Sequence, residues 1–220
     1  IVSKKNFLSQ VKDIVKANLR NILIFLSLSF IIFLSFQIYS YYSINKIQKN
    51  SITFFKLQNL ENTNEIEEII NDLTKENNFY SILSKLELIN SKIDKGNTQD
   101  SVQLYLELLS NENLNNIYKS AIASKASYEL IEFNMSNLSS DFDKEIKKIV
   151  SYIDEDLIAY QGINMEINYL LKILEAQKNN INYKDFNRAN EIYNDIMNSE
   201  FVSSAIKERA NKIHEFLSYK

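Results

Sequence analysis

The stretch from Asn21 to Asn45 contains no charged side chain, and no other feature of this sequence constrains its fold as strongly. Between Ile22 and Tyr39 the only strongly polar side chains are three serines and one glutamine. As a helix rising about 1.5 Å per residue, such a stretch extends roughly 37 Å, enough to cross a hydrocarbon core of about 30 Å. We therefore predict a transmembrane helix over residues 21–45. Its apolar surface consists of Ile22, Leu23, Ile24, Phe25, Leu26, Leu28, Phe30, Ile31, Ile32, Phe33, Leu34, Phe36, Ile38 and Tyr39.

A cleaved signal peptide is the main alternative interpretation of this stretch. The apolar region of a signal peptide is typically about 7 to 15 residues long and ends in small residues. Here the stretch ends in the sequence QIYSYY at residues 37–42, which places aromatic rings where a membrane interface belongs. The sequence therefore favours an anchor that is not cleaved.

The charges on either side of the span predict its orientation. Five basic residues precede it within residues 1–20, and three lysines follow it before the first later acidic residue, Glu61. Because an excess of Lys and Arg is typical of the cytoplasmic side, we expect residues 1–20 in the cytoplasm and residues 46–220 outside it. Apolar residues at helical spacing from Phe7 to Leu19 fit an amphipathic helix on the inner surface or a solvated lead-in equally well.

Residues 46–220 carry 20 basic and 27 acidic groups, a net charge of −7, which predicts no binding to nucleic acid. The sequence has no cysteine, no glycine-rich phosphate loop and no nucleophile-elbow motif. Its single histidine, His214, has no second metal ligand or nucleophile near it in the sequence. We therefore expect no enzyme activity, no cofactor, no metal and no small-molecule substrate.

Residues that break helices are nearly absent, because the chain has no proline and only two glycines. We predict an all-α protein in which the anchor helix continues to about Leu57 and a second helix begins near residues 62–64. Long and short helices then alternate, which favours an α-solenoid of antiparallel helix pairs, with a plain helical bundle as the alternative. The expected helices cover residues 79–93, 98–109, 114–134, 141–154, 157–179, 184–198 and 201–217.

Two segments resemble the tetratricopeptide repeat, which has a Gly-Asp pair before its second helix, then a small residue and an aromatic residue four positions later. They are GNTQDSVQLY at residues 96–105 and DFNRANEIY at residues 185–193. The small residue lets two helices approach closely, and the ring fills the gap one turn later. The Trp, the first-helix Gly and the terminal Pro of the repeat are absent. The residues that define the two segments are Gly96, Ser101, Tyr105, Phe186, Ala189 and Tyr193.

The whole layout resembles the bacterial family of ancillary SecYEG translocon subunits that carry a tetratricopeptide repeat-like domain. This resemblance covers nearly the full chain and rests on the architecture and the two repeat segments. It implies a single-pass protein of the inner (plasma) membrane with a periplasmic domain. The partners that it implies are the SecYEG translocon, a periplasmic chaperone and secreted or membrane client proteins.

Two other functions remain open from the sequence. A helical domain behind a membrane span is also typical of an extracytoplasmic sensor, although that function would require a partner subunit for signal output. A structural scaffold of a cell-envelope or division complex would differ only in its partner. If the domain is a solenoid, its groove can hold an extended or helical peptide. The tyrosines that we consider for this groove are Tyr118, Tyr128, Tyr152, Tyr160 and Tyr169, and the alternative for each ring is a place in the core.

Overall fold

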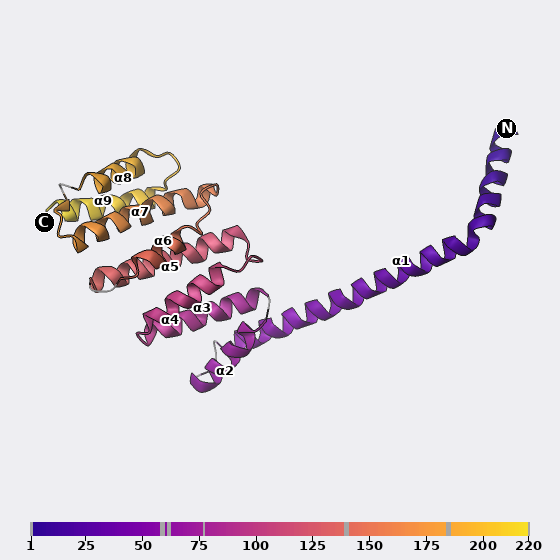
Figure 1. The fold of residues 1–220 in the computed structure, drawn as a ribbon, viewed down its shortest axis with the longest axis horizontal. Helices are drawn as coiled ribbons and strands as arrows, with labels where there is room; N and C mark the ends of the chain where they lie inside the picture. Colours follow the sequence, from indigo (N-terminus) through magenta and orange to yellow (C-terminus); the bar gives the residue numbers. More distant parts are fainter. Residues whose placement is uncertain are drawn as a thin grey trace. The chain divides into compact units, whose positions relative to one another are not determined.

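The computed structural model describes residues 2–57, 60, 63–76, 78–138, 141–183 and 186–219. Within these ranges the regular structure is entirely helical, and no strand occurs (Figure 1). The all-α prediction is therefore confirmed for the described residues. The chain divides into two compact units, Ile1–Ser84 and Lys85–Lys220, and the division falls within α3, Phe79–Asp94.

The first unit is built on one very long helix, α1, Val2–Leu57, followed by α2, Thr63–Thr74. The C-terminal end of α1 packs against α2. There the Phe54 ring is 8% exposed and lies 6.0 Å from the Tyr80 ring, measured between centroids. The Lys46 ammonium lies 2.6 Å from the Glu76 carboxylate. As predicted, α1 continues beyond the apolar stretch to Leu57, and part of this continuation is covered.

The middle of α1 has no such cover. Among the described residues, Val15–Leu57 of α1 is the one helix that is long and apolar enough to cross a membrane, and none of its most apolar stretch is buried. Phe25 and Phe36 are 71% and 66% exposed. The Ser27 hydroxyl is not free, because it donates to the Leu23 carbonyl of the same helix. By length and composition, α1 is thus a candidate membrane span, and the predicted span of residues 21–45 lies within it.

The second unit is a stack of helices whose ends are set by local chemistry. Asn97, Asn115 and Ser203 accept hydrogen bonds from backbone N–H groups at the starts of the helices that follow them. Besides α3, the stack contains α4, Thr98–Leu109; α5, Asn116–Ser136; α6, Asp143–Val150; α7, Ile158–Lys178; α8, Asn187–Asn198; and α9, Ser204–Ser218.

The predicted helix bounds agree with these to within three residues, except at the end of α6. We expected that helix to reach residue 154, and it ends at Val150. The chain turns there, because the N–H groups of Tyr152 and Ile153 donate three residues back, to Ile149 and Val150. The prediction was wrong because the turn contains neither Gly nor Pro, so nothing in its composition announces it.

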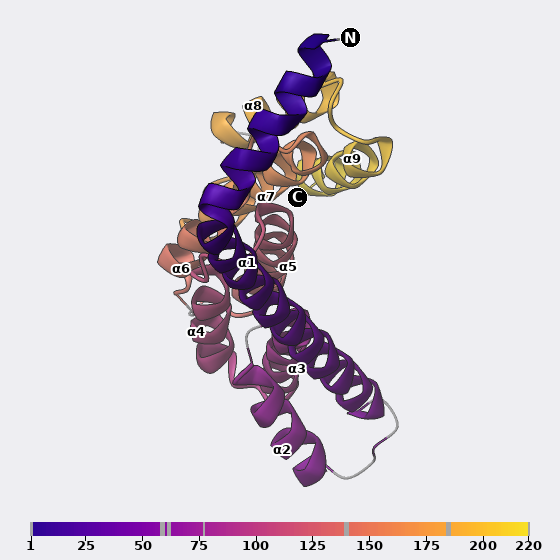
Figure 2. The same cartoon turned by 90° about the vertical axis from the view of Figure 1, so that its right-hand side faces the viewer.

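Helices of the second unit pack against near neighbours in the sequence. α4 packs against α5 and α6, α5 against α6 and α7, and α7 against α8 and α9, while α8 also packs against α9 (Figures 1 and 2). Asn116 at the start of α5 donates to Asp154 before α7, and Asn134 and Lys178 at the two helix ends both donate to Asp143. α5 and α7 therefore run parallel.

α7 and α9 also run parallel. Gly162 in the first turns of α7 lies against Val202 and Ile206 at the start of α9, and Ile173 near the end of α7 lies in the same apolar cluster as Leu217 near the end of α9. This cluster is the main core of the C-terminal part of the stack. Its buried members are Tyr169, Ile173, Tyr183, Ala189, Ile196, Val202, Ile206, Ala210 and Leu217.

Candidate interaction surface

Gly96 ends α3 through its backbone conformation. Its φ is +76°, in the left-handed region, and its N–H donates to the Ile93 carbonyl at 2.8 Å. The next N–H, from Asn97, donates to Lys92 at 2.9 Å, as in a glycine-terminated helix. A side chain on Gly96 would meet no atom within 4 Å. The backbone angle, and not crowding, is therefore what calls for glycine here.

Ser101 and Tyr105 lie on the buried face of α4. Ser101 is fully buried, and its hydroxyl lies 3.1 Å from the Asn97 carbonyl and 3.5 Å from the Ile89 carbonyl of α3. Its small side chain therefore sits where α3 and α4 approach each other. The Tyr105 ring is also fully buried, and its hydroxyl donates to the Glu129 carboxylate of α5 at 2.6 Å. Tyr105 thus joins α4 to α5.

The second repeat segment lies at the start of α8, and its first residue, 185, is outside the described residues. Ala189 is fully buried in the core cluster, and Phe186 packs against that cluster. Tyr193 is half-buried and stacks on the His214 ring of α9, with the centroids 3.9 Å apart. Its hydroxyl donates to the Asn211 side chain at 2.7 Å. This ring therefore ties α8 to α9.

The five tyrosines considered for a groove have different environments. Tyr118 is 49% exposed, and Tyr128, Tyr152 and Tyr160 are half-buried. Tyr169 has no exposed surface, and its hydroxyl lies 2.6 Å from that of Tyr183. Burial raises the pKa of Tyr169 far above its usual value. Our expectation for Tyr169 is therefore corrected: it lies on the face of α7 that α8 and α9 cover, and belongs to the core.

A buried carboxylate joins three helices. Glu166 of α7 is 2% exposed and accepts two hydrogen bonds from the Arg209 guanidinium of α9, at 2.7 and 2.6 Å. It also accepts a hydrogen bond from the Tyr128 hydroxyl of α5 at 2.6 Å. Burial and this carboxylate raise the pKa of Tyr128, and the hydrogen bond to Glu166 raises the pKa of Arg209. The charge of Glu166 is thus compensated by these hydrogen bonds, at the place where α5, α7 and α9 meet.

A similar group of contacts links the earlier helices of the stack. The Lys125 ammonium pairs with Glu129 one turn along α5, and lies 3.1 Å from the Tyr105 hydroxyl and 3.1 Å from the Asn90 side chain of α3. We call the two groups together the polar ladder, because they cross successive helices of the stack. Its members are Asn90, Tyr105, Lys125, Glu129, Tyr128, Glu166 and Arg209.

Glu166 was not predicted as a buried group, although the sequence carries a signal for it. Glu166 interrupts an apolar stripe, since Ile163, Leu170 and Ile173 stand at positions −3, +4 and +7 from it. A carboxylate at such a position predicts a buried ion pair. Gly162, one turn before Glu166, lies at a close contact between helices. A methyl group on Gly162 would lie 3.2 Å from Ile206 Cδ1 and 3.3 Å from the Val202 backbone.

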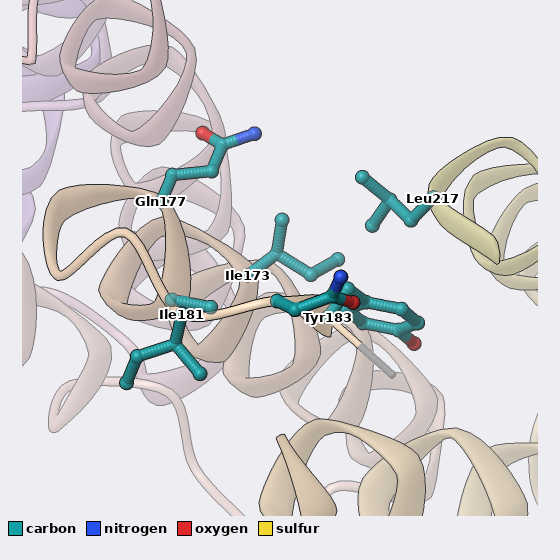
Figure 3. A pocket seen from close by; sticks show the side chains of 7 residues that line it. Ile173, Gln177, Ile181, Tyr183 and Leu217 are labelled. Carbon is teal, nitrogen blue, oxygen red and sulfur yellow. The ribbon is translucent and has the colours of Figure 1, made fainter. Parts of the chain in front are cut away.

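Two pockets flank the end of α9. One has a volume of about 230 Å³ and lies between α7 and α9, where Figure 3 shows Gln177, Ile173 and Leu217 around the open space. Its lining is largely apolar. The other, of about 350 Å³, has a polar lining that includes Tyr183, Tyr193 and His214. Over the residues that the structure describes, no group of three or more His, Cys, Asp or Glu side chains is arranged to hold a metal ion.

His214 lies at the wall of the polar pocket. Its Nδ1 is 2.9 Å from the Tyr183 hydroxyl, which in turn lies 2.6 Å from the Tyr169 hydroxyl. Burial lowers the pKa of His214 below its usual value of 6.5, and neighbouring Glu215 opposes this effect. The imidazole ring is thus held between the rings of Tyr183 and Tyr193.

Comparison of the chain with protein-family models, with curated proteins and with solved structures finds no match.

Proposed function

We propose that this chain is a membrane-anchored protein-interaction module. In this proposal α1 crosses the bacterial inner membrane with its N-terminus in the cytoplasm, and the second unit is a tetratricopeptide repeat-like solenoid in the periplasm. The observation that carries the proposal is the pairing of α1, whose most apolar stretch is not buried by any of the described residues, with a stack of helices held together by neighbour contacts. Confinement at the membrane raises the effective concentration of such a module near a membrane-bound partner.

Two observations support the anchor and its orientation. Exposed Phe and Ile side chains along the middle of α1 would be costly in water and are ordinary in hydrocarbon. Of the three lysines that follow the span, Lys46 is paired with Glu76 at 2.6 Å. The orientation is supported by the count of basic residues, five before the span against three behind it.

The order of helix packing supports the solenoid. The helices α5, α7 and α9 run side by side, each separated in sequence by one shorter helix. In a solenoid, the first helices of successive pairs stack in this way, and each pair contacts only its neighbours. The buried Ser101 and Ala189, at the small-residue positions of the two repeat segments, are consistent with close helix pairs.

The proposed partners are the SecYEG translocon, a periplasmic chaperone and their secreted or membrane clients. The support for these partners is the resemblance in layout: a basic N-terminal segment, one span and a short stack of degenerate helical repeats. The apolar pocket beside Ile173 and Leu217 is a place where a partner's apolar side chain fits.

The orientation is tested with single cysteines, because the chain has none of its own. We would place one at Ser9 and another at Asn113, and treat intact spheroplasts with a membrane-impermeant maleimide. Labelling at residue 113 only, with labelling at residue 9 after lysis, supports the proposed topology. The reverse pattern contradicts it, and the unmodified chain is the control for non-specific labelling.

The partners are tested by crosslinking the tagged full-length chain in its native membrane, followed by mild extraction and mass spectrometry. A tagged segment of residues 1–57 is the matched control, because it keeps α1 and lacks the helical stack. Translocon subunits or periplasmic chaperones recovered only with the full chain would support the proposal. A sensor kinase or division proteins, with no secretion component, would support the sensor or scaffold functions instead.

A further inference from the structure

The turns before α5, α7 and α9 lie along one edge of the second unit. α5 and α7 run parallel, and Asn116 at the start of α5 donates to Asp154 in the turn before α7. α7 and α9 also run parallel, and Gly162 lies against Val202 in the turn before α9. The three turns, residues 110–118, 151–158 and 199–203, therefore follow one another along this edge. We call them the turn edge.

Each turn of this edge exposes a large apolar side chain. Ile117 is 54% exposed, Ile158 is 65% exposed and Phe201 is 64% exposed. Tyr118, beside Ile117, is 49% exposed. Single exposed apolar residues are normal on a protein surface, but a row of them along one edge is typical of an interaction surface.

The charges of the turn edge all have one sign. The three turns contain Glu112, Asp154, Glu155, Asp156 and Glu200, and no Lys or Arg. None of these carboxylates forms an ion pair with any residue that the structure describes. Acidic residues near helix starts interact favourably with the helix N-terminus, which accounts for their position. That effect does not account for the exposed Ile and Phe side chains between them.

We propose that the turn edge binds a basic amphipathic segment of a protein partner. Lys and Arg side chains of the segment lie against the carboxylates, and its apolar side chains cover Ile117, Ile158 and Phe201. The charge of the edge selects this occupant, since an anionic lipid surface or an acidic segment would be repelled. Packed helices lie about 8–10 Å apart, so the three turns extend over roughly 20 Å, the length of a helix of about 14 residues.

This inference rests on the proposed function, because it states the chemistry of the partner that an interaction module would bind. The test uses the full-length chain in nanodiscs of phosphatidylcholine, with empty nanodiscs as the blank. The probe is a fluorescent helical peptide of about 14 residues with Leu and Phe on one face and Lys on the other. One matched peptide has Glu in place of Lys, and another has Ser in place of Leu and Phe. Fluorescence anisotropy gives the Kd of each.

Two variants remove the two features of the edge separately. The first reverses charge with Glu112→Lys, Asp156→Lys and Glu200→Lys, and the second removes apolar surface with Ile117→Ser, Ile158→Ser and Phe201→Ser. A control reverses three exposed acids away from the edge, with Glu132→Lys, Asp141→Lys and Glu191→Lys. Circular dichroism checks that each variant keeps its helix content, and Glu112→Gln with Asp156→Asn and Glu200→Gln replaces the first variant if it does not.

We expect the Lys peptide to bind, and each edge variant to raise its Kd about tenfold or more, with the control variant within about twofold. Equal binding of the Glu peptide, or an unchanged Kd in both edge variants, would overturn the proposal. A second result would also overturn it: slower hydrogen exchange at the three turns in nanodiscs that contain anionic lipid, with no slowing by the peptide. The turn edge would then face the membrane. If the peptide fails but crosslinking recovers the translocon, only this inference fails and the proposed function stands.

Discussion

α1 and α7 are both long helices rich in apolar residues, but they differ in which side chains are exposed and which are buried. The middle of α1 turns Phe25, Phe36 and their neighbours outward, with no part of its most apolar stretch buried. α7 is covered by α5, α8 and α9, and it holds the carboxylate of Glu166 inside that cover at 2% exposure. α1 thus exposes apolar side chains, whereas α7 buries a charged one.

The difference teaches that apolar content alone does not decide how a helix of this chain is used. Residues 21–45 have no charge, so this middle part of α1 lacks any group that would need an ion pair. α7 carries Glu166, Lys172, Glu175 and Lys178, each of which forms an ion pair. An uncharged helix is stable in hydrocarbon as it stands, whereas a helix with charges needs partners or water. The predictions below test the two sides of this comparison.

The largest effect is expected from placing charge in the middle of α1. The double variant Ile31→Arg with Leu34→Arg should abolish stable membrane insertion, because each Arg near the centre of a span costs about 3 kcal/mol. The measurement is the fraction of chain that stays in the pellet after alkaline carbonate extraction. The matched control, Ile47→Arg with Ile52→Arg, changes exposed residues of the same helix beyond the predicted span and should remain in the pellet. Equal extraction of both variants would show that residues 21–45 do not span.

The next effect concerns the charge inside α7. Arg209→Ala leaves Glu166 buried without its guanidinium partner, and we expect the second unit to lose about 2–3 kcal/mol of unfolding free energy. This value is lower than for a fully buried pair, because the Arg209 side chain is 53% exposed and solvent screens it. Urea unfolding of the full chain in mild detergent, followed by circular dichroism, measures the loss. Lys212→Ala breaks the exposed pair with Glu208 in the same helix and should leave the urea midpoint nearly unchanged. Equal losses would mean that Glu166 is not effectively buried.

The sequence predicts the helices well because their signals are local. The uncharged stretch, the scarcity of helix breakers and the apolar spacing gave the helical class and most helix bounds to within three residues. The end of α3 was predicted to within one residue because Gly96, in the left-handed region, is a local solution to ending a helix. The end of α6 was missed because a turn without Gly or Pro looks like helix in sequence.

The candidate surface was harder to predict, because it depends on which helices lie side by side. Tyr169 and Tyr128 look alike in sequence, yet Tyr169 is in the core while Tyr128 is half-buried and bonded to Glu166. The partner of Glu166 is Arg209, on another helix of the stack, and no local pattern joins them. The sequence shows which side chains can form hydrogen bonds or ion pairs, but it does not show locally which helices will bring their partners into contact.

A smaller effect tests how tightly α7 is covered. Gly162→Ala adds helix propensity worth about 1 kcal/mol but pushes a methyl group against the Val202 backbone and Ile206, so we expect a net loss of about 1 kcal/mol. Because Ile206 Cδ1 is the nearest atom, at 3.2 Å, Ile206→Val should relieve part of the cost. Urea midpoints of the four combinations give the coupling between the two sites. Gly96→Ala is the control glycine, since its cost comes from φ and should not change with Ile206→Val. Zero coupling between residues 162 and 206 would contradict the close contact.

The smallest effect comes from the single histidine at the covered end of the stack. The pKa of His214 is lowered by burial, so the folded chain binds fewer protons than the unfolded chain as the pH falls below about 6.5. Stability from the neutral ring is therefore fully present above that pH and is lost as the pH falls through the folded pKa. The groups that face the ring are Tyr183 and Tyr193, with Glu215 beside it in α9.

Urea midpoints measured between about pH 7.5 and pH 5.5 should therefore fall more for the natural chain than for His214→Gln, which cannot titrate. The carboxylates titrate in both proteins and cancel in the difference. Because both ring nitrogens of a protonated histidine are donors, a charged His214 can bond the Tyr183 hydroxyl only by donating to it, which restricts the hydrogen bond that this hydroxyl shares with buried Tyr169. An identical pH dependence in the two proteins would mean that His214 is solvated like an exposed histidine. The covered end of α7 and α9 would then be as open to water as their starts.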